Sequence, residues 1–341
     1  MNAERPVLNQ ETITKIRKQR QERGLVVHPI APAEPQLLKE RDIKKIKSGV
    51  SRIMEGVPAS HGWEHAQAVE EYGTYLSLSQ GIRPELIKLA ALLHDLRWEE
   101  GEERQARGLP VEIKKGSKRD TRTKGATKRT LVGLYTQGKL EATQIGNITR
   151  ATVRHGRLPE DIRHPSPIIN VLMDADRLSR QGIEGLISIV ESNRSSVPFC
   201  QNRAKIKQLT WPTNTPLFPH EKIKSCIDDL QDCDSWWNLI NEPHAYSLFQ
   251  TSRQVNRKFA EVFATHVEKQ RAKKKGSIKD YDVWLGWLKG IEEKTKPQRE
   301  KARELLAKGD HEAYRENLIT AERKAREELT IENFETYLKL T

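Results

Sequence analysis

The sequence contains few of the residues that stabilise secreted or membrane-embedded proteins. Its three cysteines, Cys200, Cys226 and Cys233, form no C-x-x-C pair. This argues against a disulfide framework and against a cysteine zinc site. No run approaches the ~20 apolar residues that a membrane-spanning helix needs, and the N-terminus lacks the apolar core of a signal peptide. We therefore expect a soluble cytoplasmic protein.

Apolar residues are also scarce. They make up 36% of the 341 residues, and the mean hydropathy is −0.73. This length allows one large domain or two modest ones, and the composition limits the size of any core.

Acidic residues are outnumbered, which gives a net charge of +12 and a pI near 9.5. A surplus of this size favours anionic partners such as nucleotides, nucleic acids or other phosphorylated molecules. Scattered lysines would be explained equally well as a solubilising surface. Residues 114–129, however, hold eight Lys or Arg against the single acid Asp120, and this clustering favours the anionic partner.

The pattern of apolar residues predicts an all-α protein. Sustained period-two alternation is absent, so no strand is expected. Helices are predicted at about 36–55, 63–80, 84–94, 121–137, 141–155, 167–192 and 236–275, and an irregular stretch at about 193–235. We divide the chain into a basic N-terminal arm (1–35), a main domain (36–275) and a charged helical C-terminal extension (276–341). The apolar stripe of the extension is weak and predicts few contacts.

Polar side chains interrupt the apolar stripes of several predicted helices. His65 lies on the face of Val69, four residues away, and His94 and Asp95 end the apolar stripe of 84–94. Asp176 shares the face of the preceding apolar residues of its helix, and His155 ends the stripe of 141–155. Singly, a histidine of this kind is more often a core residue bonded to a carbonyl, and such an aspartate a helix cap. Together they favour a shared divalent metal, because buried charges need such a partner.

Three sequence elements resemble the HD superfamily of metal-dependent phosphohydrolases. They are H-G-W-E-H-A-Q-A-V (61–69), A-A-L-L-H-D (90–95) and M-D-A-D-R-L-S (173–179). Their order and spacing are similar to those of small bacterial HD hydrolases, and the similarity spans about residues 40–192. The resemblance implies a compact all-helical fold.

The resemblance also implies roles for individual residues. It makes His65, His94, Asp95 and Asp176 the ligands of one divalent metal ion. The resemblance does not distinguish among Mn, Mg, Ni, Co, Fe and Zn as this ion. His61 is the weaker candidate for the first ligand and Asp174 for the last. His155 matches a further histidine that related enzymes often carry before the D-A-D element.

The chain departs from its relatives at 121–126, where T-R-T-K-G-A replaces the pattern H-H-E-x-G-A. The missing histidines argue against a second, fully formed metal site and leave a cationic segment. For each candidate Lys or Arg near the site, the alternative to a phosphate contact is a solvated surface charge. Candidate phosphate ligands are Arg97, Lys118, Arg119, Arg122, Lys124 and Arg177.

These residues predict hydrolysis of a phosphate ester or anhydride by a metal-activated water. Asp95 would orient the water, and His155 would donate a proton or bind a phosphate oxygen. The expected substrate is a nucleotide or a related phosphorylated small molecule. Two alternatives stay open: a nuclease that acts on single-stranded DNA or RNA, and a catalytically quiet module that binds nucleic acid or a protein.

Overall fold

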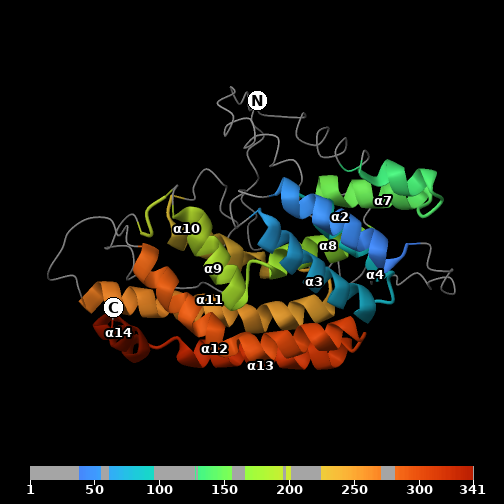
Figure 1. The fold of residues 1–341 in the computed structure, drawn as a ribbon. Helices are drawn as coiled ribbons and strands as arrows, with labels where there is room; N and C mark the ends of the chain where they lie inside the picture. The colour runs from blue at the N-terminus through green and yellow to red at the C-terminus, as the bar shows by residue number, and fades with distance from the viewer. Residues whose placement is uncertain are drawn as a thin grey trace, which may run out of the picture. The chain divides into compact units, whose positions relative to one another are not determined.

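A computed structural model describes residues 38–54, 61–95, 127, 130–155, 166–194, 197–200, 224–269 and 281–340. The elements of these residues are helices (Figure 1), which confirms the predicted all-α class. Contacts divide the chain into two compact units, one that ends at Asp176 and one that begins at Arg177. The domain boundaries expected at residues 35 and 275 stay predictions, and the arm 1–35 lies outside the described residues.

The unit that ends at Asp176 holds the sequence elements of the resemblance. Its helices are α2 (Glu40–Ile53), α3 (Trp63–Ser79), α4 (Pro84–Leu93), a helical segment at 130–136, α7 (Ala142–Arg154) and α8 (Pro167–Leu178), whose last two residues belong to the other unit. The helices predicted at 36–55, 63–80, 84–94 and 141–155 are therefore confirmed. Only the second half of the one predicted at 121–137 falls on described residues.

Helices α3 and α4 form an antiparallel pair joined by a short turn at 80–83. Pro84 is the first residue of α4. Its missing N–H costs no hydrogen bond there, because the first N–H groups of a helix have no partner within the helix. The two helices approach closely at Gly73, where a Cβ would lie 2.6 Å from the Ile87 Cγ2 atom. This pairing places the first turn of α3, with His65, beside the end of α4, with His94.

The unit that begins at Arg177 contains α9 (Gly182–Asn193), α10 (Cys226–Ser235), a 3₁₀ turn (Trp236–Leu239), α11 (Pro243–Lys269), α12 (Tyr281–Ala307), α13 (His311–Glu328) and α14 (Ile331–Leu340). The last three helices confirm the helical character of the C-terminal extension. None of the described helices in either unit combines the length and apolar character needed to cross a bilayer.

The C-terminal extension packs more closely than its sequence predicts. Trp284, Trp287 and Leu288 are 4% exposed or less and belong to one core with residues of α9 and α11. The ring of Trp284 stacks on Phe334 with centroids 3.9 Å apart. The expectation of few contacts is wrong, because a few large aromatic side chains bury as much surface as a longer aliphatic stripe.

Two boundaries in this unit also differ from the prediction. Residues 226–235 form α10 inside the stretch expected to be irregular, and the Ser225 hydroxyl caps it by accepting the Asp228 N–H at 3.2 Å. The helix predicted at 167–192 is broken after Leu178. The chain turns there and resumes as α9 at Gly182, whose φ of +75° favours glycine.

A buried carboxylate holds this turn. Glu322 of α13 accepts the N–H of Ile183 at 3.2 Å and pairs with the guanidinium of Arg299. Burial raises the pKa of Glu322 to about 7, and the charge of Glu184 adds to this rise while Arg299 opposes it. Because Glu322 is 1% exposed, its carboxylate has little room to move away from the turn.

Gly182→Ala should destabilise the protein, because a Cβ would be strained at this φ and would overlap the Glu322 carboxylate. We expect a loss of about 1–3 kcal/mol in the free energy of unfolding, measured by denaturant unfolding. The matched control is Gly290→Ala within α12, where a Cβ meets no atom within 4 Å. That change should be neutral or stabilise by up to about 1 kcal/mol. Equal stability of the two variants would contradict the constraint at the turn.

Candidate metal centre

Histidine and aspartate side chains from separate helices meet in the unit that ends at Asp176. His65 lies in the first turn of α3, and His94 and Asp95 follow the last turn of α4. His155 follows α7, and Asp176 lies near the end of α8. Three overlapping groups of these residues and His61 have donor atoms close enough to hold a metal ion.

The imidazoles of His65 and His94 approach each other closely. Their Nε2 atoms are 3.1 Å apart, and the Nε2 atom of His65 is 3.3 Å from Oδ1 of Asp176. Nitrogen ligands lie about 2.1 Å from an ion such as zinc, so two that bind the same ion are about 3–3.5 Å apart. The spacing of these donors therefore fits a single divalent cation.

Backbone carbonyls orient two of the rings. Nδ1 of His94 lies 2.6 Å from the Ala91 carbonyl, and Nδ1 of His155 lies 2.7 Å from the Thr152 carbonyl. In each ring Nδ1 must be the protonated donor, because a carbonyl oxygen can only accept. In the neutral rings the lone pair therefore lies on Nε2, which faces the cluster. Metal-binding histidines are commonly oriented in this way.

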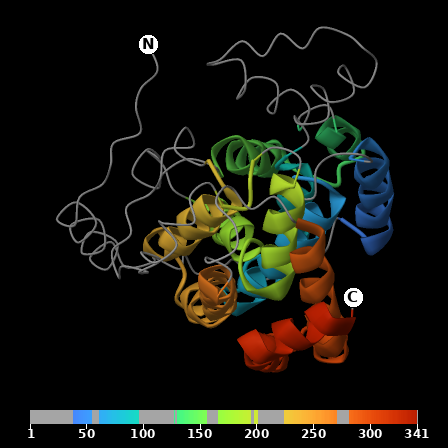
Figure 2. The ribbon, with the colours of Figure 1, turned by 90° about the vertical axis from the view of Figure 1, so that its left-hand side faces the viewer.

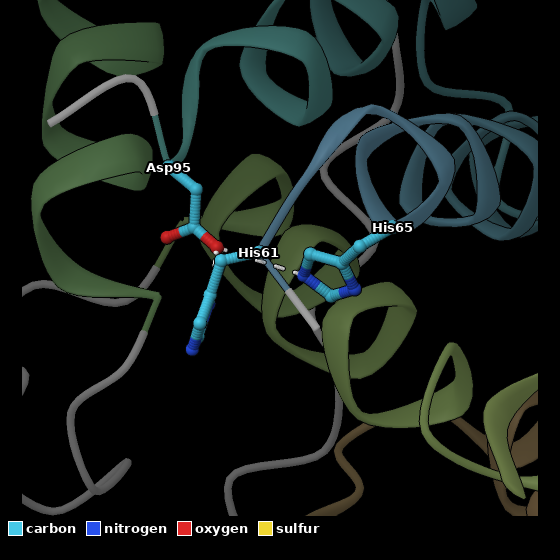
Figure 3. A group of neighbouring side chains, drawn as sticks. All are labelled: His61, His65 and Asp95. Atoms are coloured by element: carbon cyan, nitrogen blue, oxygen red, sulfur yellow. Dashed lines mark hydrogen bonds and ion pairs between the residues drawn. The ribbon is translucent and has the colours of Figure 1, made fainter. Parts of the chain in front are cut away.

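Asp95 is the centre of the cluster. Its Oδ2 lies 2.9 Å from Nδ1 of His61, 3.7 Å from Nε2 of His65 and 3.3 Å from Nε2 of His94. Its Oδ1 lies 3.7 Å from Nε2 of His155. Figure 3 shows the Asp95 carboxylate with the side chains of His61 and His65 on one side of it. Both carboxylate oxygens therefore face imidazole nitrogens.

The charges in the cluster influence one another strongly. Burial alone would lower the pKa of His94, but the negative charges of Asp95 and Asp176 outweigh it and raise the pKa to about 9. Burial would likewise raise the pKa values of the two carboxyl groups. Contacts with the histidines, chiefly His94 for Asp95 and His65 for Asp176, instead hold both pKa values below their ordinary range. Both carboxylates are thus ionised at neutral pH, as ligands of a divalent cation must be.

The structure distinguishes the two aspartates of the D-A-D element by position. Asp176 contacts the cluster, and its side chain is 23% exposed. Asp174 is fully buried and belongs to none of the potential metal-binding groups among the described residues. The less buried of the two carboxylates is therefore the one that contacts the cluster. The identity of the ligand stays a prediction.

His61 lies nearer to Asp95 than its place as the weaker ligand candidate suggested. It precedes α3, so the helical spacing gave no signal for this contact. Its side chain is 30% exposed, in contrast to the 1% of His65. This exposure places His61 at the rim of the cluster.

The structure covers the predicted phosphate ligands only in part. Arg177 is buried, and its Nη1 donates to the Leu239 carbonyl at 2.8 Å, which gives the side chain a structural role. Its phosphate contact stays a prediction. The other candidates lie outside the described residues: Arg97, Lys118, Arg119, Arg122 and Lys124.

Comparison with known proteins finds similarity only among solved structures. No family model matches the chain, and no curated protein does. A protein from Lactobacillus plantarum is 17% identical over 68% of this chain and 99% of its own, with a TM-score of 0.48. Bacillus subtilis YpgQ, solved in complex with ADP, is 15% identical over 69% of this chain and 96% of its own, with a TM-score of 0.38.

A protein from Listeria innocua is 17% identical over 70% of this chain and 99% of its own, with a TM-score of 0.39. Similarities this weak carry no inference about chemistry. The resemblance to the HD superfamily is supported by the chain's own residues, since its three sequence elements meet in one cluster. A site of buried histidines and aspartates that could hold a metal ion is therefore present.

Metal analysis of protein purified without chelator should find about one divalent ion per chain. The double change His94→Ala, Asp95→Ala should empty the site, because it removes a nitrogen ligand and the central carboxylate. The matched control is His311→Ala, Glu312→Ala, an adjacent pair at the start of α13. Full metal content in the first variant would show that the cluster is not the metal site.

Asp176→Asn should lower metal content strongly, whereas Asp174→Asn should leave it unchanged. An amide keeps the shape of the side chain but loses the negative charge that a divalent cation requires. Calorimetric titration of the purified variants with a divalent metal ion measures the difference in metal binding. The opposite result would make Asp174 the ligand.

Proposed function

We propose that this chain is an HD-type metal-dependent phosphohydrolase. It would cleave phosphate ester or anhydride bonds of nucleotides or related phosphorylated small molecules. The observation that carries this proposal is the convergence of the His65 and His94 nitrogens and the Asp176 carboxylate beside Asp95, whose other contacts are His61 and His155.

The residues fit a divalent ion held by His65, His94, Asp95 and Asp176. Such an ion would act as a Lewis acid and would make hydroxide available from water near neutral pH. Imidazole and carboxylate donors suit several first-row metals, so the donor set alone does not select one.

Two further residues are proposed to act on the substrate. Asp95 would accept a hydrogen bond from the attacking water through Oδ1, because Oδ2 already lies within 3.7 Å of three imidazole nitrogens. His155 has Nδ1 fixed as a donor to Thr152, so its Nε2 is available to hold a proton for the leaving oxygen. The Lys and Arg side chains at 118–124 are predicted phosphate ligands. They would neutralise the charge of the phosphate, as guanidinium and ammonium groups commonly do.

A screen of the purified protein tests the proposed activity. The substrates are a panel of nucleotides together with single-stranded DNA and RNA, each with Mn, Mg, Ni or Co. Release of phosphate or a nucleotide product by the parent, and none by His94→Ala, Asp95→Ala, is expected. Nucleic acid remains the alternative substrate because of the net charge of +12. Cleavage of the polymers alone would favour the nuclease.

His155→Ala should lower kcat about 100-fold or more, because a positioned proton donor contributes roughly this factor. Metal content should stay near one ion per chain, which is the readout that separates proton donation from ligation. Loss of the metal in this variant would instead make His155 a ligand. An unchanged kcat would remove it from the reaction.

A further inference from the structure

The outer face of α2 carries a row of cations that the metal centre does not use. Arg41, Lys44, Lys45 and Arg52 are all exposed, and we call them the basic stripe. At 100° per residue, these positions fall within about 60° of one line along the helix. Ser48 occupies the gap, and its carbonyl accepts the Arg52 Nε–H at 3.2 Å. Figure 2 shows α2, in blue, at the outer side of its unit.

The acidic residues of α2 pair chiefly with cations outside the basic stripe. Glu40 lies 3.6 Å from Nζ of Lys88 in α4, and Asp42 accepts a hydrogen bond from Lys139 at 2.6 Å. Both carboxylates are thus paired with cations from other segments. The cations of the basic stripe and the carboxylates of α2 therefore lie on different sides of the helix. Charges that served only to keep the protein soluble would not need this separation.

The opposite face of α2 is packed against the protein. Ile43, Val50 and Met54 are 2% exposed or less, and α2 contacts α4. A helix that binds a lipid surface needs its apolar face free to enter the bilayer, and in α2 this face is already covered. Protein interfaces are depleted in lysine and enriched in aromatic residues, and the stripe contains lysine and no aromatic residue.

We propose that the basic stripe binds the phosphate backbone of a nucleic acid. Arg41 and Arg52 are eleven residues apart, about 16 Å along the helix axis at 1.5 Å per residue. This length equals the axial rise of about five base steps of duplex DNA, at roughly 3.4 Å of axis per charge of one strand. A small phosphorylated molecule could touch only one or two of the cations.

The chemistry of the stripe also defines how the polymer is recognised. Lysine and arginine bind phosphate oxygens and read no base directly. Aromatic side chains, on which unpaired bases would stack, are absent from the stripe. Binding is therefore independent of sequence, depends strongly on salt, and does not require the metal centre.

The test compares two variants with the same change in net charge. The first is Lys44→Glu, Lys45→Glu, Arg52→Glu in α2. The control is Lys301→Glu, Lys308→Glu, Arg323→Glu, three exposed cations of the other unit. Fluorescence anisotropy measures the binding of a labelled single-stranded RNA and a duplex DNA to the full chain at several salt concentrations, and a gel confirms that the probes stay intact.

The parent should bind both probes. The α2 variant should bind at least tenfold more weakly, and the slope of log K against log salt should be shallower by about two to three. The control should stay within about threefold of the parent. His94→Ala, Asp95→Ala should bind like the parent, which separates this proposal from the metal chemistry.

Three results would overturn the proposal. They are no binding by the parent, equal losses in the α2 variant and the control, and α2-dependent binding to anionic phospholipid vesicles without binding to nucleic acid. Circular dichroism checks that each variant is folded. If the glutamate variant is not, Lys44→Gln, Lys45→Gln, Arg52→Gln removes the same charges and keeps good helix formers.

Discussion

The buried carboxylate of Asp95 is the constraint on which the rest of the site depends. It is 3% exposed and ionised, and an unpaired charge in such a place would destabilise the fold by several kcal/mol. It is stable only because imidazoles from other parts of the chain surround it. The ends of α3, α4 and α7 must therefore meet at this point, and the folded unit brings polar groups together where an apolar core would be easier to build.

With this arrangement a proton and a divalent cation would compete for the same donor atoms. Without a metal, the negative charges favour a proton on His94, whose pKa of about 9 lies well above its ordinary value. A divalent ion would take the place of that proton and satisfy the same carboxylates. The backbone carbonyls that hold His94 and His155 are independent of this exchange, so the rings keep their orientation in both states.

The sequence predicted the helices that carry the cluster, and the meeting of its residues, better than the other unit. The boundaries of α3, α4 and α7 follow from apolar periodicity, and the motif spacing indicated His65, His94, Asp95 and Asp176. The contact of His61 with Asp95 was not predictable, because His61 precedes the helix and has no periodicity. The close packing of α12 was also missed, because periodicity counts apolar positions and ignores the size of a residue such as Trp284. Helix α10 carries buried apolar residues at helical spacing (Cys226, Ile227, Leu230 and Cys233), but the Pro- and Asn-rich residues that precede it hid this signal and the cap at Ser225.

Gly73 lies about two turns along α3 from His65, and it has no polar group to offer the site. Its missing side chain nevertheless sets the distance between the axes of α3 and α4, because a Cβ there would push against Ile87. The gap between the His65 and His94 nitrogens depends on that distance. A contact between hydrocarbons thus helps to set the space available to any ion that the cluster would hold.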